Sequence, residues 1–234
     1  MAYFSPHHFN LCDLQGRVLM ETIREKLIEA STERHRDFMR KLLPTVEPER
    51  ILGVKVSVLR KIAKELPKDY LDQLPHLYYE EDMLHDFVIN RLNREEALEA
   101  VQNFLPYLDN WAVVDSLDPK SFYGDPSLME WYLDLSEDPR PYAARLGIVL
   151  ALRHIREDTS GAINRLKNIR SDHYYVQMAL GWFFAEAVLY APGEVLTLLR
   201  EGELEKGVHK KTIRKINESR RVAQSIKEQA SAYR

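Results

Sequence analysis

The chain of 234 residues contains a single cysteine, Cys12, and only nine glycines. One cysteine excludes an internal disulfide framework and a zinc site built from cysteines, and it is typical of a reducing compartment. So few glycines disfavour a protein built of many β-hairpins, whose turns need glycine. No apolar run approaches the length of a membrane span, so we expect no membrane partner.

The chain also lacks an excess of one sign of charge. It has 33 lysines and arginines and 36 aspartates and glutamates, for a net charge of −3. Such a chain has no general attraction for nucleic acid, and any surface that binds an anion must be local. Hydrophobic residues make up 45% and charged residues 29% of the chain, which predicts a globular protein. Residues 1–8 lack a basic region followed by an apolar stretch, so we expect a cytoplasmic protein without a secretory signal.

Almost every segment has the spacing of hydrophobic residues that is typical of an α-helix, and no run alternates as a half-buried β-strand does. Hydrophobic residues recur at helical spacing at Leu14, Val18, Ile23 and Leu27, at Phe38, Leu42 and Leu43, at Met83, Phe87 and Val88, and at Leu146, Val149, Leu150 and Leu152. The segment 174–191 is long and apolar on most sides, which predicts a central buried helix.

Prolines and capping residues divide these segments into pairs of helices. The breaks fall at Pro44, Pro48, Pro67, Pro75, Pro106, Pro119, Pro126, Pro139, Pro141 and Pro192, with Asp109 and Asp125 as candidate caps. The pairs recur about every 35–45 residues, which is the period of HEAT-type solenoids. We therefore expect an all-α fold, a HEAT-like repeat superhelix (an α-α solenoid). It would form one domain over residues 1–234, with 1–12 as an N-terminal extension. A generic helical bundle is the alternative.

Trp111 and Asp115 lie four residues apart, so in a helix both project from one face about one turn apart. A carboxylate beside an indole face is well suited to hold a cation. Trp182 and Arg145 lie in two other expected helices, and the four residues could line one cleft. The alternative is that Trp111 packs in the core and Asp115 ends a helix.

Charge is distributed unevenly along the chain. An acidic cluster comprises Glu130, Asp134, Glu137 and Asp138, and a basic run near the C-terminus comprises Lys206, Lys210, Lys211, Arg214, Lys215, Arg220 and Arg221. Like charges share helix faces in the basic run, which is mildly unfavourable unless they are solvated or bind an anion. Both interpretations of the basic run remain open.

Other candidate sites have simpler explanations. His7 and His8 are adjacent, but histidines at a chain end are usually too poorly ordered to bind a metal. Glu81 and His85 lie four residues apart, and without a third ligand they fit a solvated helix face better than a metal site. Gly53 stands alone, so no glycine-rich loop cradles a nucleotide phosphate. We expect no metal and no cofactor.

Five segments, in chain order, together resemble one known family. Residues 51–65 contain a Leu-Gly-Val sequence that leads into a helix, 110–117 a Trp-x-x-x-Asp motif, 144–152 an arginine-bearing helix, 175–182 a Gly-Trp helix, and 209–216 a basic helix. The ordered set resembles the AlkD-like DNA alkylation repair family, the HEAT-repeat alkylpurine DNA glycosylases. The resemblance runs from about residue 14 to about residue 222.

The resemblance implies a C-shaped solenoid, acting as a monomer, whose concave groove binds duplex DNA containing alkylated bases. It assigns the catalytic contacts with the deoxyribose of a cationic alkylated nucleotide to Trp111, Asp115 and Trp182. The family hydrolyses the N-glycosidic bond of N3- and N7-alkylpurines without flipping the base into a pocket. The expected contacts with the DNA backbone are Arg145, Lys210, Lys211 and Arg214. Roughly six phosphate contacts would lower the affinity by about three decades between 50 and 200 mM salt.

The chemistry of the substrate agrees with a site that holds one acid. An N-alkylated purine already carries a positive charge, so it can leave without a general acid. The barrier lies in the cationic sugar that develops as the bond breaks. A fixed carboxylate stabilises that cation and can orient a water, and two indole faces add cation–π attraction.

Two departures from the family's pattern flank Trp182. Active members tend to carry a basic residue where this chain has Met178, and another where it has Ala185. Loss of positive charge there weakens the grip on phosphate. Two alternatives to a glycosylase therefore stay open: a DNA-binding member of the family without excision activity, and a HEAT-type scaffold that binds protein.

Overall fold

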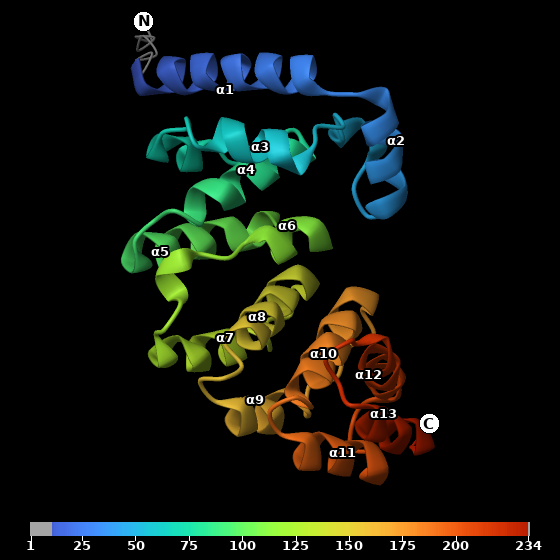
Figure 1. Cartoon of the computed structure of the whole chain (residues 1–234). Coiled ribbons are helices and arrows are strands. Elements are labelled where there is room, and N and C mark those ends of the chain that lie inside the picture. The colour runs from blue at the N-terminus through green and yellow to red at the C-terminus, as the bar shows by residue number, and fades with distance from the viewer. Residues whose placement is uncertain (1–10, 234) are drawn as a thin grey trace, which may run out of the picture. The chain divides into compact units, whose positions relative to one another are not determined.

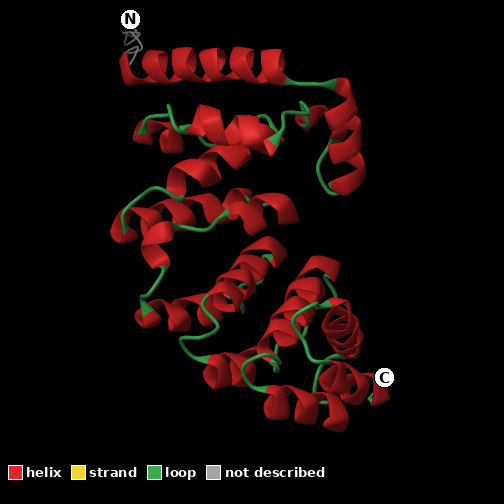
Figure 2. Ribbon diagram, viewed as in Figure 1, coloured by secondary structure: helices red, strands yellow, loops and turns green. Residues whose placement is uncertain are grey.

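The computed structural model describes residues 11–233, with side chains from residue 15 onward. Within this range every regular element is a helix, which confirms the expected all-α fold (Figure 2). No helix in the described part is long and apolar enough to cross a membrane. The expected extension over 1–12 is described only where residues 11 and 12 begin the first helix, and His7 and His8 lie outside the described residues.

The chain divides into two compact units, Met1–Tyr107 and Leu108–Arg234, called unit 1 and unit 2 below. The helices of unit 1 are α1 (Leu11–Ala30), α2 (Glu33–Leu42), α3 (Val56–Ala63), α4 (Tyr79–Ile89) and α5 (Arg94–Phe104). Short 3₁₀ helices of unit 1 span Pro48–Arg50, Lys68–Asp72 and Leu105–Tyr107. That the whole chain forms one domain stays a prediction.

The helices of unit 2 are α6 (Trp111–Ser116), α7 (Met129–Leu135), α8 (Pro141–Arg153), α9 (Thr159–Leu166), α10 (Tyr174–Ala187), α11 (Pro192–Glu201), α12 (Lys206–Glu218) and α13 (Gln224–Ala232), with 3₁₀ helices at Lys120–Phe122 and Pro126–Leu128. The colour sequence of Figure 1 follows these helices along the chain. As the proline pattern predicts, α2 ends before Pro44 and α8 begins at Pro141.

The Leu-Gly-Val sequence of unit 1 has a structural role. The buried Glu80 carboxylate accepts hydrogen bonds from the backbone N–H groups of Leu52 (3.0 Å), Gly53 (2.7 Å) and Val54 (3.2 Å). Gly53 has a φ of 91°, a left-handed conformation that glycine adopts without strain. The sequence therefore fixes the loop before α3 to the first turn of α4.

The expectation of a solvated face at Glu81 and His85 is wrong, because both side chains are buried. Glu81 forms an ion pair with Arg24 (2.7 Å), and the His85 Nδ1 atom lies 3.0 Å from the Nε2 atom of His76. Burial lowers the pKa of His85 to about 3 and that of His76 to about 4, so both rings are neutral at pH 7. Across the described residues, no group of three His, Cys, Asp or Glu side chains is placed to hold a metal ion.

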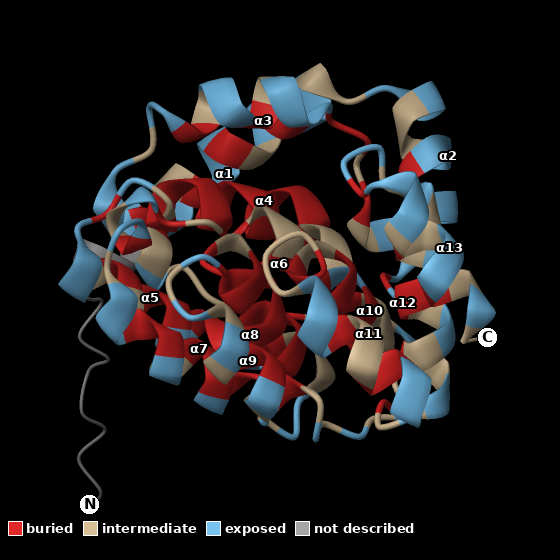
Figure 3. Cartoon of the chain, turned by 60° about the horizontal axis from the view of Figure 1, so that its bottom comes forward, coloured by how far each residue is buried: buried red, intermediate tan, exposed pale blue. Residues whose placement is uncertain are grey.

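Unit 2 packs its helices in two rows, consistent with an α-solenoid. One row consists of α8, α10 and α12, and each of these helices packs against the next. The other row contains two pairs: α7 packs against α9, and α11 packs against α13. The predicted central helix is confirmed as α10, which contacts α8, α9, α11 and α12 and buries Val176, Phe183 and Phe184. Figure 3 shows that most of α8 is buried as well.

Gly181 sets the distance between α10 and α12. A Cβ atom at this position would lie 2.7 Å from the Lys211 Cβ and 3.2 Å from the Lys211 carbonyl carbon. Real Cβ atoms do not approach their neighbours so closely, so only glycine lets α12 lie directly against α10. The basic residues of α12 are thereby held beside Trp182, the next residue of α10.

We expect Gly181→Ala to lower the free energy of unfolding, because α12 must move away from α10 to make room for the methyl group. Overpacking of this kind costs about 1–3 kcal/mol. Urea unfolding followed by circular dichroism measures the loss.

Gly193→Ala is the matched control for this prediction, since a Cβ at Gly193 of α11 meets nothing within 4 Å. Alanine is the better helix former, so this variant should be neutral or up to about 1 kcal/mol more stable. Equal effects of the two substitutions would contradict the role assigned to Gly181.

Candidate functional site

Helix α6 positions the Trp111 and Asp115 side chains. Its N-cap is Asn110, whose side-chain oxygen accepts hydrogen bonds from the backbone N–H groups of Ala112 (3.1 Å) and Val113 (3.0 Å). The expectation that Asp109 caps this helix is therefore wrong: Asp109 accepts a hydrogen bond from the Asn110 amide instead (2.8 Å). Asn110 succeeds because the residue directly before the first helical residue can reach the free N–H groups. Trp111 thus begins the helix, and Asp115 follows one turn later.

The expected second cap is present at Asp125. Its carboxylate accepts a hydrogen bond from the Ser127 backbone N–H (3.1 Å) at the start of the 3₁₀ helix Pro126–Leu128. This helix leads directly into α7, which packs against α8. The cap therefore supports the helix that carries Arg145.

Arg145 projects from α8 and holds Asp115 in a two-point ion pair. Its Nε donates to Oδ1 of Asp115 (3.0 Å) and its Nη2 donates to Oδ2 (2.8 Å). The third guanidinium nitrogen, Nη1, donates to the backbone carbonyl of Tyr175 at the start of α10 (2.7 Å). One arginine therefore joins α6, α8 and α10.

The two side chains of this ion pair differ in their exposure to solvent. The Arg145 side chain is 7% exposed, whereas the Asp115 side chain is 21% exposed. The carboxylate can therefore meet a ligand while the guanidinium stays behind it. The expected contact of Arg145 with the DNA backbone stays a prediction, and its observed partners favour a role in positioning Asp115.

Four residues singled out from the sequence line one pocket in unit 2. The pocket has a volume of about 370 Å³ and is lined by Trp111, Asp115, Arg145, Tyr174, Tyr175, Met178, Trp182 and Lys215. Its members come from α6, α8, α10 and α12. Trp182 is 38% exposed and Tyr174 is 57% exposed, so aromatic rings face the solvent beside a carboxylate.

Sequence reasoning missed Tyr174, Tyr175 and Lys215 as members of this pocket. A signal for Tyr174 was present, because it precedes Trp182 by eight residues and so shares a helix face with it. Lys215 belongs to the basic run of the sequence, but nothing in the sequence predicts that it reaches this pocket, since its place depends on how closely α12 approaches α10. Its ammonium group also lies 3.2 Å from the Glu218 carboxylate.

The other basic residues of α12 lie beside the pocket. The Lys211 ammonium donates to the Gln177 side chain (2.7 Å) and lies 5.2 Å from the centre of the Tyr174 ring. Arg214 is largely exposed and pairs with Glu218 (2.7 Å), while Lys210 is exposed one turn before it. This arrangement places several cations on one helix next to the aromatic pocket.

The two departures from the family's pattern occupy different environments. Met178 lines the pocket one turn before Trp182 and makes that wall apolar. Ala185 is only 5% exposed and packs in the interior. A basic side chain at this position would have to be buried there. Lys215 is therefore the basic side chain that reaches this pocket from α12.

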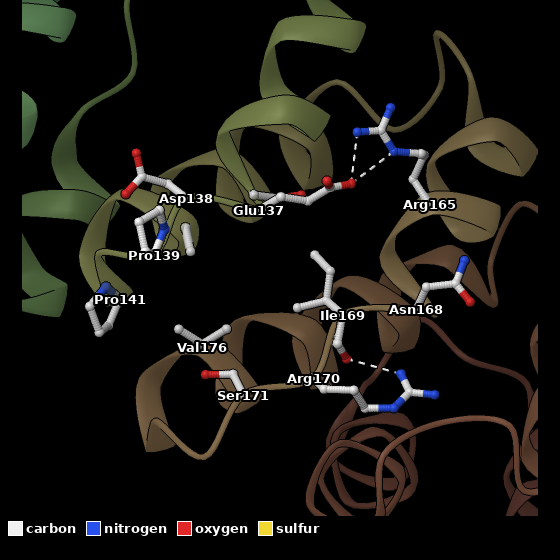
Figure 4. Close-up of a pocket in the computed structure, with 12 residues that line it drawn as sticks. Glu137, Asp138, Pro139, Pro141, Arg165, Asn168, Ile169, Arg170, Ser171 and Val176 are labelled. Atoms are coloured by element: carbon white, nitrogen blue, oxygen red, sulfur yellow. Dashed lines mark hydrogen bonds and ion pairs between the residues drawn. The ribbon is translucent and has the colours of Figure 1, made fainter.

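A second pocket of unit 2, about 470 Å³, contains none of the predicted site residues (Figure 4). Arg165 lies at its edge and bonds to Glu130 (2.8 Å), Asp134 (3.1 Å) and Glu137 (2.7 Å). Arg140 pairs with the remaining member of the acidic cluster, Asp138 (2.6 Å). All four members of the acidic cluster thus form ion pairs with Arg165 or Arg140.

We expect Asp115→Asn and Arg145→Gln each to lower the free energy of unfolding by about 2–3 kcal/mol, because each leaves a partly buried group without its counter-charge. The double variant should cost less than the two single variants added together, with a coupling of about 1 kcal/mol or more. Urea unfolding of the four proteins measures the cycle.

The control for this cycle is Glu201→Gln, which removes the acid of the exposed pair between Arg200 and Glu201. An exposed pair contributes little, so its loss should change the stability by no more than about 0.5 kcal/mol. Additive effects of the Asp115 and Arg145 substitutions would show that the pair does not hold the three helices together.

Comparison with known proteins places this site in a family context. A family model described as DNA alkylation repair enzyme matches residues 23–223. The match includes every residue that lines the pocket of Asp115. A search of curated proteins found no matching relative. Because the family model covers most of the sequence, the chain belongs to the DNA alkylation repair enzyme family.

Proposed function

We propose that this chain is a DNA glycosylase that hydrolyses the N-glycosidic bond of cationic N3- and N7-alkylpurines in duplex DNA. One observation carries the proposal: the Asp115 carboxylate lies in the same pocket as the indole rings of Trp111 and Trp182. Membership of the family supplies the biological setting, the repair of alkylated DNA. The pocket supplies the chemistry, because an acid that shares a pocket with aromatic rings attracts a cation.

The substrate decides which catalytic groups are needed. Alkylation at N3 or N7 places a positive charge on the purine, so the base leaves as a neutral molecule without protonation. The electron deficit that remains on the sugar resembles the oxocarbenium ion of glycoside hydrolysis. A site for this reaction therefore needs a negative charge near C1′ more than it needs a general acid.

Asp115 meets this need because it is fixed before the substrate arrives. Each carboxylate oxygen has lone pairs beyond those that accept from Arg145, and the side chain is partly open to the pocket. One of these lone pairs can face the developing cation or orient the attacking water. Preorganised charge of this kind contributes about 3–4 kcal/mol to a transition state.

The pairing with Arg145 has a cost and a benefit for this mechanism. The guanidinium partly offsets the negative charge of Asp115, which weakens its pull on the cation. It also holds the carboxylate in one orientation through two bonds, so little reorganisation is needed during the reaction. Trp111 and Trp182 then contribute attraction from their ring faces.

Binding to the DNA backbone falls to α12. We assign phosphate contacts to Lys210, Lys211 and Arg214, and we add Lys215 because it lines the pocket. Positive charge on this helix compensates for the apolar Met178. The alternative function, a DNA-binding protein of the same family without excision, is favoured by that same methionine in the pocket wall.

We expect Asp115→Asn to lower the rate of single-turnover release of an N7-alkylpurine by about 10²–10³-fold, because the shape stays and the charge is lost. Affinity for undamaged duplex should stay near that of the wild type, since other residues hold the phosphates. The assay belongs at a temperature at which circular dichroism shows the variant to be folded.

Asp134→Asn makes the same change of charge at an exposed position of unit 2 and should leave both rate and affinity unchanged. Wild-type protein that binds duplex DNA but releases no N3- or N7-alkylpurine would contradict the glycosylase. In that event Met178→Lys tests whether the missing basic residue is the cause.

A further inference from the structure

A third pocket of unit 2 lies at the C-terminal ends of α8 and α10 and has a volume of about 460 Å³. Its lining includes Arg153, Arg156, Glu186, Tyr190 and Arg221. None of these residues lines the pocket of Asp115. Three of these five residues are arginines.

Two of these arginines converge on the same oxygen atom. The Arg156 Nε donates to the Tyr190 hydroxyl (3.2 Å) and the Arg221 Nη2 donates to it as well (3.4 Å). The Arg156 guanidinium also lies 5.4 Å from the centre of the Tyr190 ring. These bonds from Arg156 and Arg221 lower the pKa of Tyr190, as expected where the local potential is positive.

Two of the three arginines have an acidic partner: Glu186 bonds to Arg221 (2.6 Å) and Asp118 pairs with Arg153 (3.4 Å). Arg156 forms no ion pair among the described residues, because the third acid nearby, Glu157, bonds to the His154 ring (3.0 Å). The two guanidinium groups beside the Tyr190 hydroxyl repel each other, and Glu186 offsets the charge of Arg221 alone. A phosphate oxygen accepts from such planar, forked donors more strongly than a phenol does.

The position of this cavity relates it to the pocket of Asp115. Trp182 and Glu186 lie on α10 at an interval of four residues, and Tyr190 lies in the turn that follows the end of this helix at Ala187. A strand that passes Trp182 and continues beyond the end of α10 would bring the phosphate of another nucleotide to Tyr190.

Arg153 connects the two sites physically. It lines the cavity of Tyr190, and its guanidinium donates to the backbone carbonyls of Leu117 (2.8 Å) and Asp115 at the end of α6. The helix that carries Asp115 is thus fixed to the wall of the cavity of Tyr190.

We propose that Arg156, Tyr190 and Arg221 form a phosphate-binding subsite that takes a backbone phosphodiester of duplex DNA, at a nucleotide other than the one held at Asp115. The subsite rests on the proposed function for its ligand, DNA, and not for the excision step. It binds the DNA strand through a phosphate that lies away from the bond that is hydrolysed. It therefore contributes to affinity and not to the rate of bond cleavage.

The first test compares the double variant R156Q/R221Q with the wild type on undamaged duplex DNA. The slope of log affinity against log salt concentration should fall by about 1–2 in the double variant. Arg200→Gln is the matched control, because Arg200 is an exposed arginine of unit 2 outside the cavity, and it should leave the slope unchanged. A slope that is unaltered in the double variant, or equally altered in Arg200→Gln, would overturn the subsite.

The second test locates the phosphate. In duplexes with one alkylated purine, each phosphate within five nucleotides of the lesion is replaced in turn by an uncharged methylphosphonate. One replacement away from the lesion nucleotide should weaken binding of the wild type and have no further effect on R156Q/R221Q. Losses that are additive with the double variant at every position would contradict the assignment.

The outcomes separate the subsite from the glycosylase. A lower salt slope in R156Q/R221Q together with no excision by the wild type would support the subsite and reject the glycosylase. Wild-type protein that binds no duplex DNA would overturn the subsite as a DNA contact. Binding of inorganic phosphate, followed by thermal unfolding and lost in the double variant, would then reassign the cavity to a free phosphate.

Discussion

The ion pair between Arg145 and Asp115 is the interaction on which the rest of the site depends. Its two parallel bonds join α8 to α6, and the third bond of the arginine joins both to the first turn of α10. The cost of burying a guanidinium is offset only because all three acceptors are in place. The pair therefore acts as a structural centre of unit 2 and, by the same geometry, sets the orientation of the carboxylate that faces the pocket.

A good part of this arrangement could be predicted from the sequence. Helical spacing and prolines located most helices, and the interval of four residues placed Trp111 and Asp115 on one face of α6. The partner of Arg145 could not be predicted, because an arginine in an apolar helix is compatible with either a phosphate or a carboxylate. The burial of Glu81 and His85 was missed for a related reason: their partners, Arg24 and His76, lie on other segments.

The closeness of α10 and α12 also escaped sequence analysis, although its cause is one glycine. Gly181 allows contact with the backbone of Lys211, and this contact brings Lys215 to the pocket. Positive charge thus reaches Trp182 from a neighbouring helix and not from position 178 of its own helix. The arginines around Tyr190 extend the same principle, since groups from the segments that follow α8, α10 and α12 meet only in the folded chain.

The most direct measurement is the single-turnover excision rate and the DNA affinity of Arg145→Lys. Lysine keeps the positive charge but cannot hold both carboxylate oxygens of Asp115. If Arg145 positions Asp115, the rate at saturating DNA falls by about 10²-fold while the affinity for undamaged duplex stays unchanged. A variant with a normal rate and weakened, less salt-dependent binding would contradict this account and show that Arg145 contacts the DNA backbone.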